Sequence, residues 1–204
     1  MLEELQAELR VLNLLRQVFL KEPGKDLLEG MGRIVLPREE KGEAGGLKTM
    51  VDSVRKNKSR LEDWREELSL EFARLFIGPV HAPAVPYASF YLSETPSLMT
   101  EETLEVRKRY LAVGLALKDL YQIPDDHVAM EVEFLYYLTR EAIQSMEAGR
   151  NEEASRFLSM RNNFIKEHMA LWVPLFAERI VESTNEGFFQ GAAMLLQDFI
   201  DTHR

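Results

Sequence analysis

The sequence predicts an all-α protein, a single-domain helical bundle with one proline-rich loop between helices. Apolar residues recur at three- and four-residue steps along most of the chain, as on the buried stripe of an amphipathic helix. No stretch shows the sustained two-residue alternation and β-branched enrichment that is typical of a half-buried strand. With no internal repeat, the chain is predicted to form one domain over residues 1–204.

Composition indicates a soluble globular protein. The 204 residues suffice for one domain with a sizeable core, and 46% hydrophobic with 29% charged residues is an ordinary balance. No apolar run is long enough for a transmembrane span, and the acidic N-terminal stretch lacks the features of a secretion signal. Cysteine is absent, which excludes disulfides and thiolate chemistry and suits a reducing compartment. We expect a cytoplasmic protein without membrane insertion.

The net charge of −9 argues against nucleic-acid binding, because proteins that bind phosphate backbones usually carry a clustered basic surface. An acidic protein is better suited to a basic partner. The same charge also serves solubility, and composition does not choose between these two readings.

The first helices are delimited by proline and glycine. Pro23 with Gly24 ends the first, Pro37 the second, and Gly78 with Pro79 the third region. Residues 38–46 are polar and predict a surface loop. The helical stretches predicted in this half are the first twenty residues, residues 26–35 and residues 47–76, the last broken near residues 56–59.

In the second half, Thr100 is expected to cap a helix that reaches about Leu120. The turn IPDDH, residues 123–127, stops that helix, and Asp125 or Asp126 is expected to cap the next one. Pro174 is expected to kink or restart the chain. The helices predicted after the turn are residues 128–149, 151–171, 175–181 and 188–200.

Two features interrupt the helical pattern, a proline-rich loop at residues 77–99 and the PDDH turn at residues 123–127. The loop region holds four of the eight prolines, yet it is threaded with aromatic and aliphatic residues. Prolines stiffen the backbone, so apolar side chains can be presented at low entropic cost. The loop is therefore either a crossover packed on helix ends or one wall of a groove for an apolar peptide.

A search for catalytic motifs finds no glycine-rich phosphate loop and no serine elbow. His127 and Glu131 share one helix face, but a metal site normally needs three or four ligands. The acidic cluster of Asp125, Asp126, His127, Glu131 and Glu133 fits three interpretations equally. It can be an acid–base site, a capped helix start, or a docking point for arginine.

Several short motifs, in this order and in an all-helical setting, carry a resemblance over most of the chain. The chain is similar to the TorD/DmsD/NarJ family of redox-enzyme maturation chaperones, and within it to the TorD-like branch. Val85 and Ala88 depart from the family's loop pattern, and Val132 replaces another apolar residue. The matching residues are Leu75, Phe76, Gly78 and Pro79; Pro83, Pro86, Tyr87, Ser89 and Tyr91; Pro124, Asp125, Asp126, His127, Glu131, Glu133 and Phe134; and His168, Trp172 and Pro174.

The resemblance implies a cytoplasmic, non-enzymatic chaperone without a cofactor of its own. Its implied partner is the apo form of a molybdopterin-dependent oxidoreductase, held by its twin-arginine signal peptide or N-terminal region until the cofactor is inserted. We expect the loop to form an apolar groove whose rim, Asp125 to His127, meets arginines. The expected peptide-binding residues are Phe72, Leu75, Phe76, Pro86, Tyr87, Ser89, Tyr91, Pro124, Asp125, Asp126, His127 and Glu131.

Three alternatives remain open. Within the family, the chain can be a NarJ-like assembly chaperone of a membrane-anchored nitrate reductase. Outside it, the chain can be a helical metal-dependent enzyme that uses His127 and Glu131. It can also be a helical interaction module that dimerises through its apolar stretch, and a homodimer with exchanged helices is compatible with the long loop.

Overall fold

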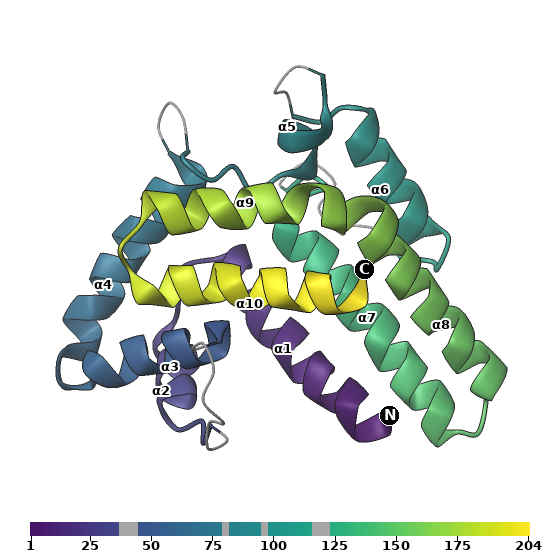
Figure 1. Ribbon diagram of the computed structural model, residues 1–204, viewed down its shortest axis with the longest axis horizontal. Coiled ribbons are helices and arrows are strands. Elements are labelled where there is room, and N and C mark those ends of the chain that lie inside the picture. The colour runs from purple at the N-terminus through teal and green to yellow at the C-terminus, as the bar shows by residue number, and fades with distance from the viewer. Residues whose placement is uncertain (37–44, 79–81, 95–97, 116–122) are drawn as a thin grey trace. The chain divides into compact units, whose positions relative to one another are not determined.

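The computed structural model describes residues 1–204 except 37–44, 79–81, 95–97 and 116–122 (Figure 1). Over these ranges the chain is helical with one isolated β-bridge and no named strand, which confirms the all-α class. None of the described helices combines the length and apolar character that crossing a membrane requires. The elements are α1 (Leu2–Leu20), α2 (Lys25–Gly32), α3 (Gly46–Lys56), the 3-10 turn η1 (Lys58–Arg60), α4 (Leu61–Phe72), the π-helical η2 (Ala73–Ile77), α5 (Ala88–Leu92), α6 (Glu101–Leu111), α7 (Val128–Glu147), α8 (Asn151–Phe164), the π-helical η3 (Ile165–Met169), α9 (Ala170–Ser183) and α10 (Gly187–His203).

Packing divides the chain into two compact units, each assembled from segments that are far apart in sequence. The first unit contains Met1–Leu20, Pro86–Trp172 and His203–Arg204, and the second contains Lys21–Val85 and Val173–Thr202. Helices α9 and α10 each contribute residues to both units. The prediction of a single domain over residues 1–204 stays a prediction.

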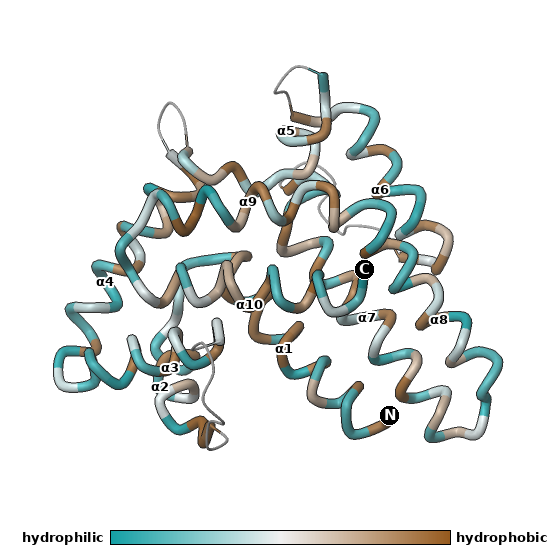
Figure 2. Tube along the Cα trace, in the orientation of Figure 1, coloured by the Kyte–Doolittle hydropathy of each residue, from teal (hydrophilic) through white to brown (hydrophobic). Residues whose placement is uncertain are grey.

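In the first unit, α7 packs against both α1 and α8. The predicted apolar stripe of α1 is buried at Leu5 and Leu12, whereas Leu2 at the helix start is exposed. Apolar and polar stretches alternate along the traces of α1 and α7 (Figure 2), as expected when one face of each helix meets the core. Burying a leucine side chain fully stabilises the fold by about 1.5–3 kcal/mol relative to leaving it exposed. Arg161 of α8 pairs with Glu8 of α1 at 2.6 Å, so a charged contact also joins these helices.

The second unit has an aromatic core and one close helix contact. Phe76 lies 6.1 Å from Phe176 and 5.8 Å from Phe189 between ring centroids. Where α3 meets α10, a Cβ added at Gly191 would lie 2.6 Å from the carbonyl oxygen of Gly46, which is closer than real Cβ atoms come. Glycine at these positions therefore lets the two backbones approach closely.

Several predicted helix positions differ from the structure. Helix α5 lies inside the stretch predicted to be a loop, residues 77–99. The helix after Thr100 ends at Leu111 rather than near Leu120, because Gly114 adopts φ 76° and the amide of Leu115 bonds back to the carbonyl of Tyr110 at 3.0 Å. The predicted polar loop at 38–46 and residues 116–122 lie largely outside the described residues.

The helix predicted over 151–171 is helical throughout but contains a π-helical segment, and the helix continues past its predicted end. It changes to the π-helical η3 after Phe164, and α9 starts at Ala170 and carries Pro174 inside it. Proline has no amide hydrogen and clashes with the carbonyl four residues earlier, which here belongs to the first residue of α9. His168 in this π-helical segment and Trp172 in α9 are both buried in the first unit.

Candidate functional site

The proline-rich stretch and the PDDH turn are joined directly in the first unit. Tyr87 and His127 form an antiparallel β-bridge, and their rings pack edge to face with centroids 5.0 Å apart. We call this the joint, meaning residues 86–89 together with 125–128. Two backbone hydrogen bonds close it, from the Ala88 amide to the Asp126 carbonyl at 3.0 Å and from the Val128 amide to the Pro86 carbonyl at 2.8 Å.

Asp126 lies at the centre of the joint and is fully buried. Its Oδ2 accepts a hydrogen bond from the backbone amide of Ser89 at 2.8 Å. Among the described residues, neither Oδ1 of Asp126 nor Oγ of Ser89 has a hydrogen-bond partner. A buried polar atom without a partner costs about 1–3 kcal/mol, more for a charged group, so both atoms keep unused hydrogen-bonding capacity at an energetic cost.

Asp125 is also buried, but its charge is paired. Both Nε and Nη2 of Arg107 donate to its Oδ2, at 2.9 and 2.6 Å. Its carbonyl oxygen accepts from the hydroxyl of Tyr110 at 2.8 Å. The turn is therefore fixed to α6 through one ion pair and one hydrogen bond.

His127 begins α7 as its N-cap, a role that the sequence assigned to Asp125 or Asp126. Its Nδ1 accepts from the amide of Ala129 at 3.1 Å, which satisfies one free donor at the helix start. Burial lowers the pKa of His127 to about 4, although the Asp126 charge opposes this, so the ring is neutral near pH 7. A neutral ring can keep Nδ1 as an acceptor.

Asp125, Asp126 and His127 are 2%, 0% and 8% exposed, so all three are buried in this structure. They cap and close the turn from inside, because their partners are backbone amides, Arg107 and Tyr87. Pro86 and Ser89 are likewise buried, whereas Tyr87, Tyr91 and Pro124 are half-buried. Their part in peptide binding stays a prediction.

Glu131 is fully buried on α7 and makes two side-chain contacts. Its Oε1 lies 2.6 Å from Nε2 of His168, and its Oε2 accepts from Nε1 of Trp172 at 3.1 Å. Burial raises the pKa of Glu131, and His168 partly opposes the shift. The indole of Trp172 stacks on Tyr91 of α5 with ring centroids 5.7 Å apart. Glu131 thus connects α7, the π-helical segment and the proline-rich stretch.

The metal-enzyme alternative finds no support in this geometry. His127 and Glu131 are engaged with different partners, Ala129 for the ring and His168 for the carboxylate. Within the described ranges, no cluster of three His, Cys, Asp or Glu side chains is arranged to hold a metal ion.

Phe72, Leu75 and Phe76 belong to the second unit. The other predicted binding residues belong to the first unit. All three are buried, and the rings of Phe72 and Phe76 contact each other with centroids 5.1 Å apart. They belong to the aromatic core of that unit.

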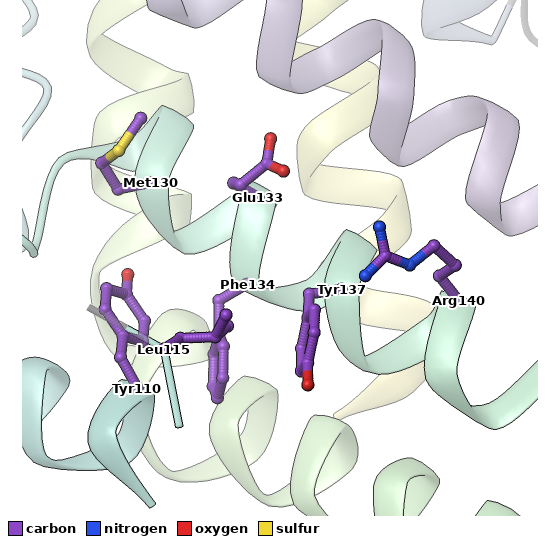
Figure 3. A pocket seen from close by; sticks show the side chains of 7 residues that line it. All are labelled: Tyr110, Leu115, Met130, Glu133, Phe134, Tyr137 and Arg140. Atoms are coloured by element: carbon purple, nitrogen blue, oxygen red, sulfur yellow. The ribbon is translucent and has the colours of Figure 1, made fainter. Parts of the chain in front are cut away.

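A cavity of about 300 Å³ lies beside α7 in the first unit (Figure 3). Phe134 and Tyr137 point to the same side of the helix, and Tyr110 links the cavity wall to the joint through its bond to Asp125. Charged groups are present at this wall but have partners in the chain. The cavity is lined by Tyr110, Leu115, Met130, Glu133, Phe134, Tyr137 and Arg140.

Sequence reasoning missed the partners that surround the predicted residues. Nothing in the spacing of Arg107 or Tyr110 indicated a contact with Asp125. His168 and Trp172 were noted only as part of a motif, whose spacing of four residues places both on one side of a helical turn. That spacing was the available signal for a shared partner such as Glu131.

The comparisons with known proteins agree with the motifs. The family described as nitrate reductase delta subunit matches residues 38–178, which include every predicted binding residue. A protein named Chaperone protein TorD from Vibrio parahaemolyticus is 31% identical over 161 residues, 78% of this chain and 74% of the relative. Proteins of the same name from Aliivibrio fischeri and Vibrio cholerae are 30% and 29% identical, over 68% and 76% of this chain and 63% and 68% of their own lengths. The chain therefore belongs to the nitrate reductase delta subunit family, the TorD/DmsD/NarJ group that its motifs resemble.

Proposed function

We propose that this protein is a cytoplasmic chaperone for a molybdopterin-dependent oxidoreductase. It binds the twin-arginine signal peptide or N-terminal region of the apoenzyme and holds the apoenzyme for cofactor insertion before export or assembly. Family membership supports this, as do the relatives named as TorD chaperones. The acidic net charge of −9 suits a ligand with a basic start.

One observation at the joint carries the peptide-binding part of the proposal. Asp126 has a buried carboxylate oxygen with no hydrogen-bond partner among the described residues. The hydroxyl of the neighbouring Ser89 is also buried and has no partner among them. A guanidinium offers several N–H donors and a positive charge, and it pairs with carboxylates in a defined geometry. An arginine from the peptide would supply the hydrogen-bond donor and the positive charge that the Asp126 carboxylate lacks.

The apolar body of a signal peptide needs a different surface. Tyr87 in the joint and Tyr91 just after it are half-buried, so their rings can contact an arriving peptide first. Because Asp126 is buried, binding requires local opening of the joint. The cavity beside α7 offers a further apolar wall, formed by Met130 and Phe134 among others.

Calorimetry with a synthetic twin-arginine signal peptide tests the proposal. Asp126→Asn keeps the shape of the side chain but removes its charge, and we expect the dissociation constant to rise about tenfold or more. The matched control is Asp63→Asn, which removes the same charge from an exposed position of α4 and should leave the affinity unchanged.

A second peptide in which both arginines are replaced by glutamine separates charge recognition from apolar binding. The proposal predicts much weaker binding of that peptide to the unaltered protein. Equal affinity for both peptides, or an unaffected Asp126→Asn variant with a native circular-dichroism spectrum, would rule out arginine recognition at the joint.

A NarJ-like role is the second candidate, and the description of the matching family as nitrate reductase delta subunit favours it. Such a chaperone would hold the catalytic subunit of a membrane-anchored nitrate reductase. Affinity purification from the native host, followed by mass spectrometry, distinguishes the candidates. An exported reductase supports the first, and a nitrate reductase catalytic subunit supports the second.

A further inference from the structure

The buried carboxylates of the first unit differ in how their charge is balanced. Asp125 is paired with Arg107, and Glu131 is paired with His168 at 2.6 Å. Asp126 has no ion pair among the described residues, and its only observed donor is the Ser89 amide. His168 is therefore the titratable group in direct contact with one of these carboxylates, Glu131.

His168 is enclosed by the core of its own unit. Its ring stacks on Phe164 with centroids 5.1 Å apart, and its side chain is 11% exposed. Several ionisable groups act on it, and Arg109 among them is engaged with Glu167 at 3.0 Å. The charged groups that interact electrostatically with His168 are Glu131 on α7, Asp126 in the turn, and Arg109 and Glu102 on α6, and Glu167 precedes it in the chain.

We propose that protonated His168 is the internal counter-ion of Glu131 and Asp126, and that a guanidinium bound at the joint releases the His168 proton. The inference rests on the proposed peptide-binding function and adds regulation by pH to the same site. Glu131 makes the direct contact with His168, whereas Asp126 acts on it through space. Ligand binding and His168 protonation then compete for the same negative charge.

The direction of the effect follows from electrostatics. Burial lowers the pKa of His168, but the Glu131 charge and hydrogen bond outweigh burial and raise it, and Asp126 adds to the rise. A peptide cation beside Asp126 offsets the rise in the His168 pKa that the Asp126 charge causes. The pKa of His168 therefore falls when the peptide binds. Linkage is reciprocal, so loss of the His168 proton must strengthen peptide binding. Affinity therefore increases as the pH rises through the pKa of His168.

Calorimetry of the twin-arginine peptide in buffers with different ionisation enthalpies measures proton release directly. At a pH close to the pKa of His168, we expect a fraction of one proton to be released per peptide bound. As the pH rises through the pKa of His168, the affinity should increase about fivefold. His168→Gln keeps an N–H donor for Glu131 but cannot titrate, so both the proton release and the pH dependence should disappear.

The matched control is His203→Gln, because His203 also pairs with a carboxylate of the first unit, Glu8, at 3.1 Å. This variant should release protons as the unaltered protein does. Peptide binding without proton release in the unaltered protein overturns the inference, as does proton release that persists in His168→Gln.

A second measurement needs no peptide. The pKa of His168, followed by nuclear magnetic resonance, should be lower in Asp126→Asn than in the unaltered protein, because the variant removes one of the charges that raise it. An unchanged pKa refutes the coupling. A lowered pKa in a protein that binds no peptide supports the coupling and rejects the proposed function, so the two failures are distinguishable.

Discussion

At the scale of single residues, the first unit depends on buried polar side chains that cap a helix or pair with side chains of other helices. His127 caps α7, and Asp125 forms an ion pair with Arg107. Glu131 contacts His168 and accepts a hydrogen bond from Trp172. A buried ion is stable only while its partner is present, because removing one member leaves a charge that water cannot reach. These contacts are therefore the positions at which single substitutions should have the largest effects.

His127 makes the stability of the protein depend on pH. The folded state keeps the ring neutral down to pH about 4, whereas the unfolded chain protonates it below its ordinary pKa of 6.5. Stability from this group is fully present above pH 6.5 and is lost as the pH falls toward 4, by up to about 3 kcal/mol. His127→Asn keeps a good N-cap and should lose less stability over the same range in urea unfolding. An identical pH dependence in both proteins would contradict this assignment.

Arg107 should stabilise the folded protein by balancing the charge of Asp125. Arg107→Gln leaves Asp125 buried without its cation, and we expect a loss of about 2 kcal/mol, less than for a fully buried pair because the arginine side chain is 30% exposed. Adding Asp125→Asn removes the stranded charge, so the double variant should be more stable than the sum of the two single losses predicts. Denaturant unfolding of the four proteins measures the coupling, and additive losses would show that the ion pair contributes nothing.

At the scale of helices, close backbone contact sets what α3 and α10 tolerate. A Cβ at Gly191 would lie 2.8 Å from the backbone nitrogen of Met50 and would force the helices apart. Gly191→Ala should therefore lower the free energy of unfolding by about 1–3 kcal/mol. The matched control is Gly30→Ala in α2, where no atom lies within 4 Å and alanine should stabilise the helix by about 0.5–1 kcal/mol. Thermal unfolding compares them, and the same sign for both would contradict the packing explanation.

At the scale of the whole molecule, α9 belongs to both compact units, which meet along the chain between Trp172 and Val173. Unfolding of either unit should disrupt this continuous helix and so destabilise the other. Each unit contains one tryptophan, Trp64 in the second and Trp172 in the first. In Trp64→Phe and Trp172→Phe, the fluorescence transition should coincide with the loss of helical circular dichroism. Separate midpoints would indicate two independently folding domains rather than one.

The sequence alone determined the all-α class, the family and the residues of the two irregular features. Helical periodicity and the positions of proline and glycine are local properties, so they locate helices without knowledge of the fold. The end of α6 was missed because the apolar pattern continued past Leu111, although Gly114 was the residue that stopped it. Only the tertiary structure decided that His127 caps α7 and that Glu131 contacts His168.

The contact between Glu131 and His168 joins residues that are 37 positions apart in the chain, and no local pattern encodes which partner a buried carboxylate receives. Tertiary structure likewise decided that Asp125 and Asp126 are buried, since their acidic character by itself predicted exposure. The unpaired oxygen of Asp126 and the His168 counter-ion follow from the same burial, because charges within a low-dielectric core must be balanced by neighbours rather than by water.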